Sequence, residues 1–184
     1  MKLINFQKVK DGKYLKNYEL TYLNKSGKEK IFEIVSRRSL NGPEDLGANP
    51  SGVSIVAIHN NKMLLLKEFR MGINRTIYNL CAGMINAEET MEECIRRELY
   101  EETGLQLKCI KKILPPSFAA VAISDVTTQI AFVEVQGSFQ DHSSDNEQIH
   151  ARFYSREEVK KLLETESFSS RAQMAAYFFS EYGL

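Results

Sequence analysis

Residues 83–105 read GMINAEETMEECIRRELYEETGL, and this segment contains the signals of one well-defined helix. Thr90, followed three residues later by Glu93, forms a capping box, which marks a helix N-terminus. Gly104 is placed where a helix usually ends in a left-handed residue. We therefore expect the segment from Thr90 to Thr103 to be a helix of about four turns.

Two glutamates of this helix fall on its apolar face. At about 100° per residue, Glu98 and Glu102 project into the same arc as Cys94 and Ile95, and Glu101 lies at the edge of that arc. Burying a carboxylate costs several kcal/mol, and like charges four residues apart add repulsion. A divalent cation relieves both penalties, and oxygen donors alone suit Mg²⁺ or Mn²⁺.

A solvated, charge-laced helix is the alternative interpretation of the same segment. Glu93, Arg97 and Glu101 follow one another at four-residue steps, so these three fit an ordinary surface ladder of ion pairs. Glu98 and Glu102 do not fit that ladder. Zinc is disfavoured because the cluster contains no histidine or cysteine ligand set.

The chain before this helix contains two hairpin patterns. Residues 17–38 hold two runs rich in aromatic and β-branched side chains on either side of Lys25-Ser26-Gly27, and residues 53–58 and 63–68 flank a second polar turn. Between the hairpins, glycines and prolines in residues 41–52 indicate a linker. We expect a small N-terminal β unit over residues 1–48 and a main domain over residues 49–184.

The rest of the main domain alternates strands with helices. The helix after Ser155 is marked by a second capping box with Glu158. Interleaved elements of this kind predict an α/β or α+β layered domain. The expected strands are residues 76–82, 107–114, 126–135 and 149–154, and the further helices are residues 156–164 and 170–182.

Composition limits the classes of function. The 184 residues include 24 basic and 24 acidic side chains, so no overall field attracts nucleic acid or an anionic membrane. No stretch approaches the roughly 20 apolar residues of a membrane span, and the N-terminus lacks a signal-peptide pattern. The three cysteines have no spacing typical of disulfide frameworks or zinc sites. We expect a cytoplasmic protein without a nucleic-acid or membrane partner.

The helix and the glycine before it complete a longer pattern. Gly83, five residues, Glu89, seven residues, and then residues 97–105, RELYEETGL, resemble the Nudix box at every specified position. The resemblance implies an α/β/α sandwich with a mixed sheet, in which the loop and helix of the box hold divalent cations against a diphosphate. The predicted N-terminal antiparallel β unit precedes this sandwich.

The resemblance also implies roles for individual residues around the metal. Glu98 and Glu102 would bind the cation directly, Glu101 would bind additional metal, and the backbone carbonyl of Ala82 would complete the site.

Four further residues of the motif have structural roles by the same resemblance. Glu89 and Arg97 would orient the loop and helix through a salt bridge. Gly83 would let the backbone turn sharply and approach the metal, and Gly104 would end the helix.

Outside the box, the chain resembles the ADP-ribose pyrophosphatase branch of the family. Residues 66–70, LKEFR, and 79–83, NLCAG, are similar to two strands of that branch, residues 36–38, SRR, occupy the place of an arginine pair, and residues 145–149, DNEQI, look like its late acidic loop. By this likeness Arg38, Arg70 and Asn79 would contact substrate.

Two departures from the branch concern the substrate. Asn79 stands where the branch has glutamate, and Cys81 stands where it has proline. Residues 117–125 are only loosely similar to the corresponding loop of the branch.

The resemblance implies Mg²⁺-dependent hydrolysis of the pyrophosphate bond of a nucleoside diphosphate sugar, with ADP-ribose giving AMP and ribose 5-phosphate. Glu147 is the first choice for the general base and Asp145 the second. The branch also implies a homodimer in which the N-terminal units contribute to each other's substrate sites. The alternatives are a Nudix hydrolase for a GDP-sugar, a dinucleotide or a nucleoside triphosphate, and a module that binds ADP-ribose without cleaving it.

Overall fold

The protein was analysed as a computed structural model that describes residues 1–140, 142 and 148–183. The chain forms two compact units, one made of residues 1–51 with 116–128 and the other of residues 52–115 with 129–184. The first unit therefore takes in a segment from the middle of the chain, which the sequence patterns did not group with the N-terminal hairpin.

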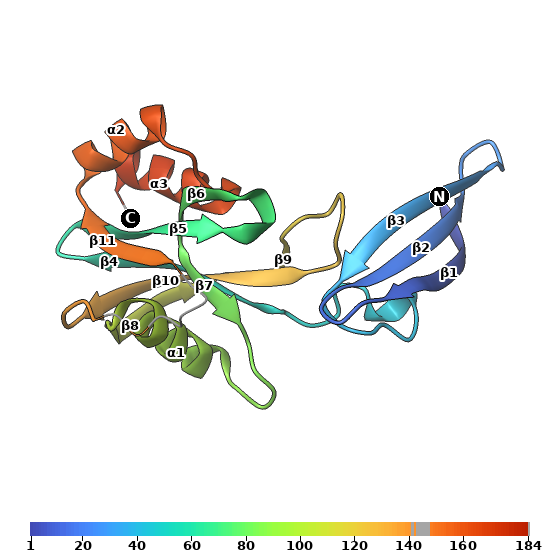
Figure 1. The fold of residues 1–184 in the computed structure, drawn as a ribbon, viewed down its shortest axis with the longest axis horizontal. Helices are drawn as coiled ribbons and strands as arrows, with labels where there is room; N and C mark the ends of the chain where they lie inside the picture. Colours follow the sequence, from blue (N-terminus) through green and yellow to red (C-terminus); the bar gives the residue numbers. More distant parts are fainter. Residues whose placement is uncertain (141, 143–147, 184) are drawn as a thin grey trace. The chain divides into compact units, whose positions relative to one another are not determined.

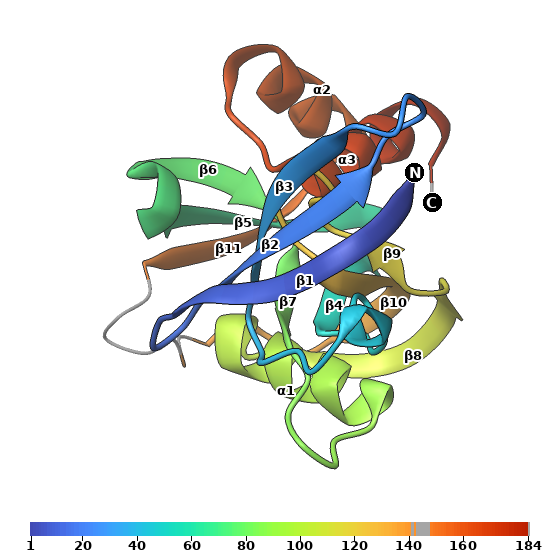
Figure 2. The same cartoon turned by 90° about the vertical axis from the view of Figure 1, so that its right-hand side faces the viewer.

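The first unit contains a three-stranded antiparallel sheet. Its strands are β1 (Lys2–Asp11), β2 (Lys16–Leu23) and β3 (Glu29–Ser36), with β2 in the centre (Figure 2). The turn between β2 and β3 has Gly27 at φ 75°, a left-handed conformation that glycine adopts without strain, so the predicted hairpin is confirmed. Its core consists of Tyr18, Leu20, Ile34 and Leu40.

Two strands of the first unit were not foreseen. Strand β1 is mostly exposed, so it lacks the alternation of apolar and polar residues by which a half-buried strand is recognised. The other is the two-residue strand β9 (Ser117–Phe118), which pairs with the first residues of β10. A short 3₁₀ turn (Pro43–Asp45) follows β3 within the expected linker.

The second unit is built on a mixed sheet of strand order β11-β5-β4-β10-β8, with β6 paired to β5 and β7 paired to β4. Strand β10 runs parallel to β4, and the other pairs are antiparallel. The strands are β4 (Gly52–His59), β5 (Lys62–Arg70), β6 (Arg75–Asn79), β7 (Cys81–Met84), β8 (Gln106–Ile113), β10 (Thr127–Gln136) and β11 (Ile149–Tyr154).

Helices cover both faces of this sheet. Helix α1 (Met91–Thr103) lies on one face, and helices α2 (Arg156–Thr165) and α3 (Ser170–Tyr182) lie on the other (Figure 1). Neighbouring residues of β4 show the division, because Ile55 packs in the core on the α1 side and Val56 in the core on the α2 and α3 side. The expected α/β/α sandwich with a mixed sheet is confirmed.

The turn and cap signals correspond to observed structure. Asn60 and Asn61 have φ 48° and 58° in the tight turn between β4 and β5. Helix α1 begins with both hydrogen bonds of the Thr90 capping box and ends at Gly104 with φ 74°. Among the described residues, no helix has the length and apolarity that a membrane span needs.

One expected strand is instead two strands. The segment 76–82 divides at the buried Leu80 into β6, which pairs with β5, and β7, which pairs with β4. The apolar pattern is continuous through the break, because Leu80 stays in the core while the chain changes its pairing partner.

Candidate active site

The site is formed where β7 leads through a loop into α1. Gly83 lies on β7 directly against the carboxylate of Glu98, and a Cβ atom at position 83 would collide with that carboxylate. The close approach of backbone to side chain is therefore available only to glycine. The same approach brings Gly83 on β7 and Glu98 on α1 together in one site.

Two carboxylates of α1 are withdrawn from solvent in this site. Glu98 is 8% exposed, and Glu102 is half-buried with Oε2 accepting a hydrogen bond from the Ala82 N–H at 3.1 Å. Burial raises the pKa of Glu102 to about 8 and also raises the pKa of Glu98, where the adjacent Arg97 opposes the shift. Burial therefore outweighs the ion pair with Arg97 at Glu98, and a bound cation would relieve the desolvation of both carboxylates.

Arg97 ties the loop to the helix. Its guanidinium forms two hydrogen bonds to Glu89, from Nε at 2.8 Å and from Nη2 at 2.9 Å. Its Nη1 donates to Glu98 at 2.6 Å and to Glu101 at 3.0 Å. This arrangement lowers the pKa of Glu89 to about 2, chiefly through the hydrogen bond from Arg97.

The surface-ladder interpretation describes only part of the helix. Arg97 and Glu101 do form an ion pair four residues apart, and Glu101 is exposed. The Glu93 carboxylate accepts from the N–H and hydroxyl of Thr90 in the capping box.

The donors at this site suit a hard divalent cation in an open site. Among the described residues, no group of three or more acidic, histidine or cysteine side chains is arranged to hold a metal ion by itself. An open site is what Mg²⁺ requires, because it is usually bound by one or two carboxylates and completes its coordination with water and substrate phosphate. The observation in favour of the fit is the pair of desolvated glutamates beside a glycine backbone.

A third buried carboxylate, Glu68, faces this group from β5. Glu68 is 5% exposed, and its charge is one of the influences that raise the pKa of Glu102 after burial itself. The sequence analysis assigned it no role, although the period-two pattern could have shown it. Leu64 and Leu66 lie in the core on the α1 side, and Glu68 is the next residue of that face.

The expected substrate residues occupy different surroundings. Arg70 is exposed, with Nη1 3.5 Å from Glu68 Oε1. Asn79 is half-buried, and its Nδ2 donates to Glu68 Oε1 at 2.6 Å. Arg38 belongs to the first unit, where its Nη2 donates to the Asp45 carbonyl at 2.7 Å. The two residues proposed as general base, Asp145 and Glu147, lie outside the described residues.

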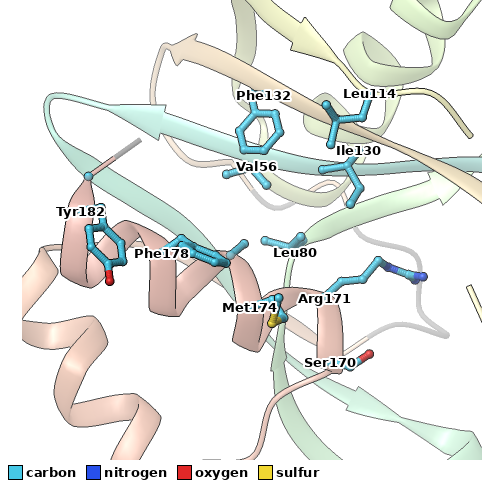
Figure 3. A pocket seen from close by; sticks show the side chains of 12 residues that line it. Val56, Leu80, Leu114, Ile130, Phe132, Ser170, Arg171, Met174, Phe178 and Tyr182 are labelled. Carbon is cyan, nitrogen blue, oxygen red and sulfur yellow. The ribbon is translucent and has the colours of Figure 1, made fainter. Parts of the chain in front are cut away.

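A separate apolar cavity of about 840 Å³ lies between the sheet and α3. Figure 3 shows Val56, Ile130 and Phe132 of the sheet facing Met174 and Phe178 of α3 across it. None of the residues that line this cavity is acidic. It is on the face of the sheet that α1 does not cover, so it is distinct from the carboxylate site.

Comparison with known proteins places the chain in a family. The chain belongs to the NUDIX domain family, whose model matches residues 48–177. It is 26% identical over 129 residues to an ADP-sugar pyrophosphatase of Mus musculus, covering 70% of this chain and 59% of that protein. It is 29% identical over 149 residues to an ADP-ribose pyrophosphatase of Saccharomyces cerevisiae, covering 77% and 62%. The chain thus spans about three fifths of the length of these two relatives.

The fold also matches a solved structure over almost its whole length. The crystal structure of an ADP compounds hydrolase superposes with a TM-score of 0.74, at 20% sequence identity, covering 98% of this chain and 92% of that one. At this identity the likeness shows the fold.

Proposed function

We propose that this protein is a Nudix pyrophosphohydrolase that cleaves the diphosphate of a nucleoside diphosphate sugar, with ADP-ribose giving AMP and ribose 5-phosphate. The single observation that supports this best is the desolvated pair Glu98 and Glu102 on α1, packed against the Gly83 backbone. Relatives named as ADP-sugar and ADP-ribose pyrophosphatases favour this substrate class.

Glu98 and Glu102 would hold Mg²⁺, or Mn²⁺, with Glu101 binding additional metal and the Ala82 backbone completing the site. A bound divalent cation supplies charge neutralisation for the diphosphate and acidifies water. Arg97 keeps Glu98 and Glu101 within reach of one another through its hydrogen bonds. Arg70 would offer a forked guanidinium to the phosphates, and the exposure of its side chain supports this role.

Three further assignments belong to this proposal. Glu147, or Asp145 in its place, takes the proton from the attacking water. Asn79 and Arg38 contribute to substrate binding. The residues before position 49 form a unit that contributes to dimerisation and to the partner's substrate site, in a cytoplasmic homodimer.

The test is turnover of ADP-ribose by the purified protein in Mg²⁺, followed as AMP release. Glu98→Gln and Glu102→Gln should each lower kcat by orders of magnitude, because each removes a negative charge that would bind the proposed cation. Glu92→Gln is the matched control, because Glu92 is an exposed glutamate of the same helix that pairs with Arg96. Wild-type turnover in both site variants would overturn the metal roles, and a substrate panel with a GDP-sugar, a dinucleotide and a nucleoside triphosphate tests the substrate class.

A further inference from the structure

A chain of partly buried hydrogen bonds runs from the N-cap of α3 to Glu68 on β5. The Ser169 hydroxyl donates to Asn79 Oδ1 at 2.5 Å, and Asn79 Nδ2 donates to Glu68 Oε1 at 2.6 Å. Each member is held from a different element, since Ser169 is the N-cap of α3, Asn79 ends β6 and Glu68 lies on β5. The orientation of the Asn79 amide is thereby fixed, because its oxygen accepts and its nitrogen donates.

The hydrogen bond from Asn79 fixes the position of the Glu68 carboxylate. It is almost fully buried, it points to the α1 side of the sheet, and Asn79 Nδ2 donates a hydrogen bond to it from a neutral amide. A buried carboxylate of this kind needs a cation nearby. The cation that the described residues supply is Arg70, whose Nη1 is 3.5 Å from the same Oε1 atom.

The two side chains of this ion pair differ in their exposure to solvent. The Glu68 side chain is 6% exposed, whereas the Arg70 side chain is 57% exposed. One end of the ion pair is therefore fixed in the protein, and the other end is exposed; within the described part of the chain, Glu68 is the acidic partner recorded for Arg70. An arginine tethered by one nitrogen can still offer the rest of its fork to a phosphate.

We infer that Glu68 is a positioning residue of the active site, oriented by Asn79 and Ser169, which holds the Arg70 guanidinium ready for the diphosphate of the substrate. This role rests on the proposed function, because it requires a diphosphate ligand. It also gives a physical purpose to the asparagine at position 79, since an amide can donate to Glu68, whereas a glutamate there would place a second negative charge against it.

The test is a double-mutant cycle between Glu68 and Arg70. Steady-state kinetics with ADP-ribose and Mg²⁺ are measured for the wild type, Glu68→Gln, Arg70→Ala and the double variant. Glu68→Gln should raise KM about tenfold and change kcat by less than about twofold, the pattern of a lost binding contact. The double variant should be no worse than Arg70→Ala alone, because Glu68 acts through Arg70.

Two further variants separate positioning from a merely structural role. Adding Asn79→Asp to Glu68→Gln restores a carboxylate and amide pair of nearly the same shape but moves the negative charge from β5 to β6. If charge at position 68 positions Arg70, the swapped protein should melt near the wild-type temperature yet keep the raised KM. The control for arginine is Arg75→Ala, because Arg75 is exposed and lies opposite Arg70 in the β5 and β6 pair.

The outcomes distinguish this inference from the proposed function. Additive losses in the double variant, or full recovery of KM in the swapped protein, would overturn the positioning role while leaving the hydrolase intact. If the wild type releases no AMP, the proposed function fails, and the same cycle is then measured as ADP-ribose binding in Ca²⁺ by calorimetry. A wild type that neither hydrolyses nor binds ADP-ribose overturns both.

Discussion

Glu89 shows how one side chain connects charge to stability in this protein. Its pKa of about 2 lies well below the ordinary value of 4.5 for glutamate, chiefly because Arg97 donates to it. A carboxylate with a lowered pKa contributes stability that is present above pH 4.5 and is lost as the pH falls through about 2. Urea midpoints measured from pH 7 to pH 2 should therefore show Glu89→Gln below the wild type at neutral pH, with the two curves converging in acid. Parallel curves would contradict this.

Gly83 offers a test in which folding and activity separate. The atoms nearest to an added Cβ are those of the Glu98 carboxylate, the far end of a side chain that can shift. Gly83→Ala should therefore have a melting temperature within a few degrees of the wild type but a kcat about 100-fold lower, because Glu98, the proposed metal ligand, would be displaced by about an ångström. Equal melting and equal turnover would show that the backbone approach has no role in the chemistry.

Single residues also show what could be predicted from the sequence. The inward direction of Glu98 followed from a helical wheel, because local geometry fixes which way a helical side chain points. The burial of Glu68 could equally be predicted from strand alternation, but its hydrogen bond from Asn79 and the bond from Ser169 to Asn79 could not. Those two are 90 residues apart in sequence, and only tertiary structure brings them together.

At the level of elements, the cap of α1 determines where the motif helix begins. Thr90 accepts from the Glu93 N–H and supplies donors to its carboxylate. Thr90→Ala should lower the free energy of unfolding by about 1 kcal/mol, measured by urea denaturation. Thr165→Ala is the matched control, because Thr165 is the last residue of α2 and its hydroxyl donates to the Lys161 carbonyl instead of capping a helix N-terminus. A larger loss in the control would contradict a capping role.

The elements that could be predicted are those with local signals. Capping boxes and a tight asparagine turn depend on neighbours in the chain, so they identified α1, α2 and the hairpin of β4 and β5. The division between β6 and β7 has no such signal, because it depends on which strand lies alongside. Strand β1 is likewise defined by its pairing with β2.

For the whole molecule, the proposed cation should act as a folding ligand. If Mg²⁺ binds the folded protein alone, a concentration about 100 times its Kd should stabilise the fold by about 2.7 kcal/mol. The melting temperature in Mg²⁺ should therefore be higher than the melting temperature in EDTA at matched ionic strength. This difference should vanish in the double variant that carries Glu98→Gln and Glu102→Gln. A Mg²⁺ effect that survives both substitutions would place the ion elsewhere.

The first unit is assembled from two separated stretches of chain. The Val35 N–H donates to the Ile123 carbonyl at 2.8 Å, so β3 holds the excursion of residues 116–128. Removing the residues before position 49 would leave that excursion without its anchor, with exposed Val121 and Ile123 at its tip. Producing the second unit by itself should therefore require replacing the excursion with a short turn as well, because an N-terminal deletion alone would leave an exposed apolar loop that promotes aggregation and proteolysis.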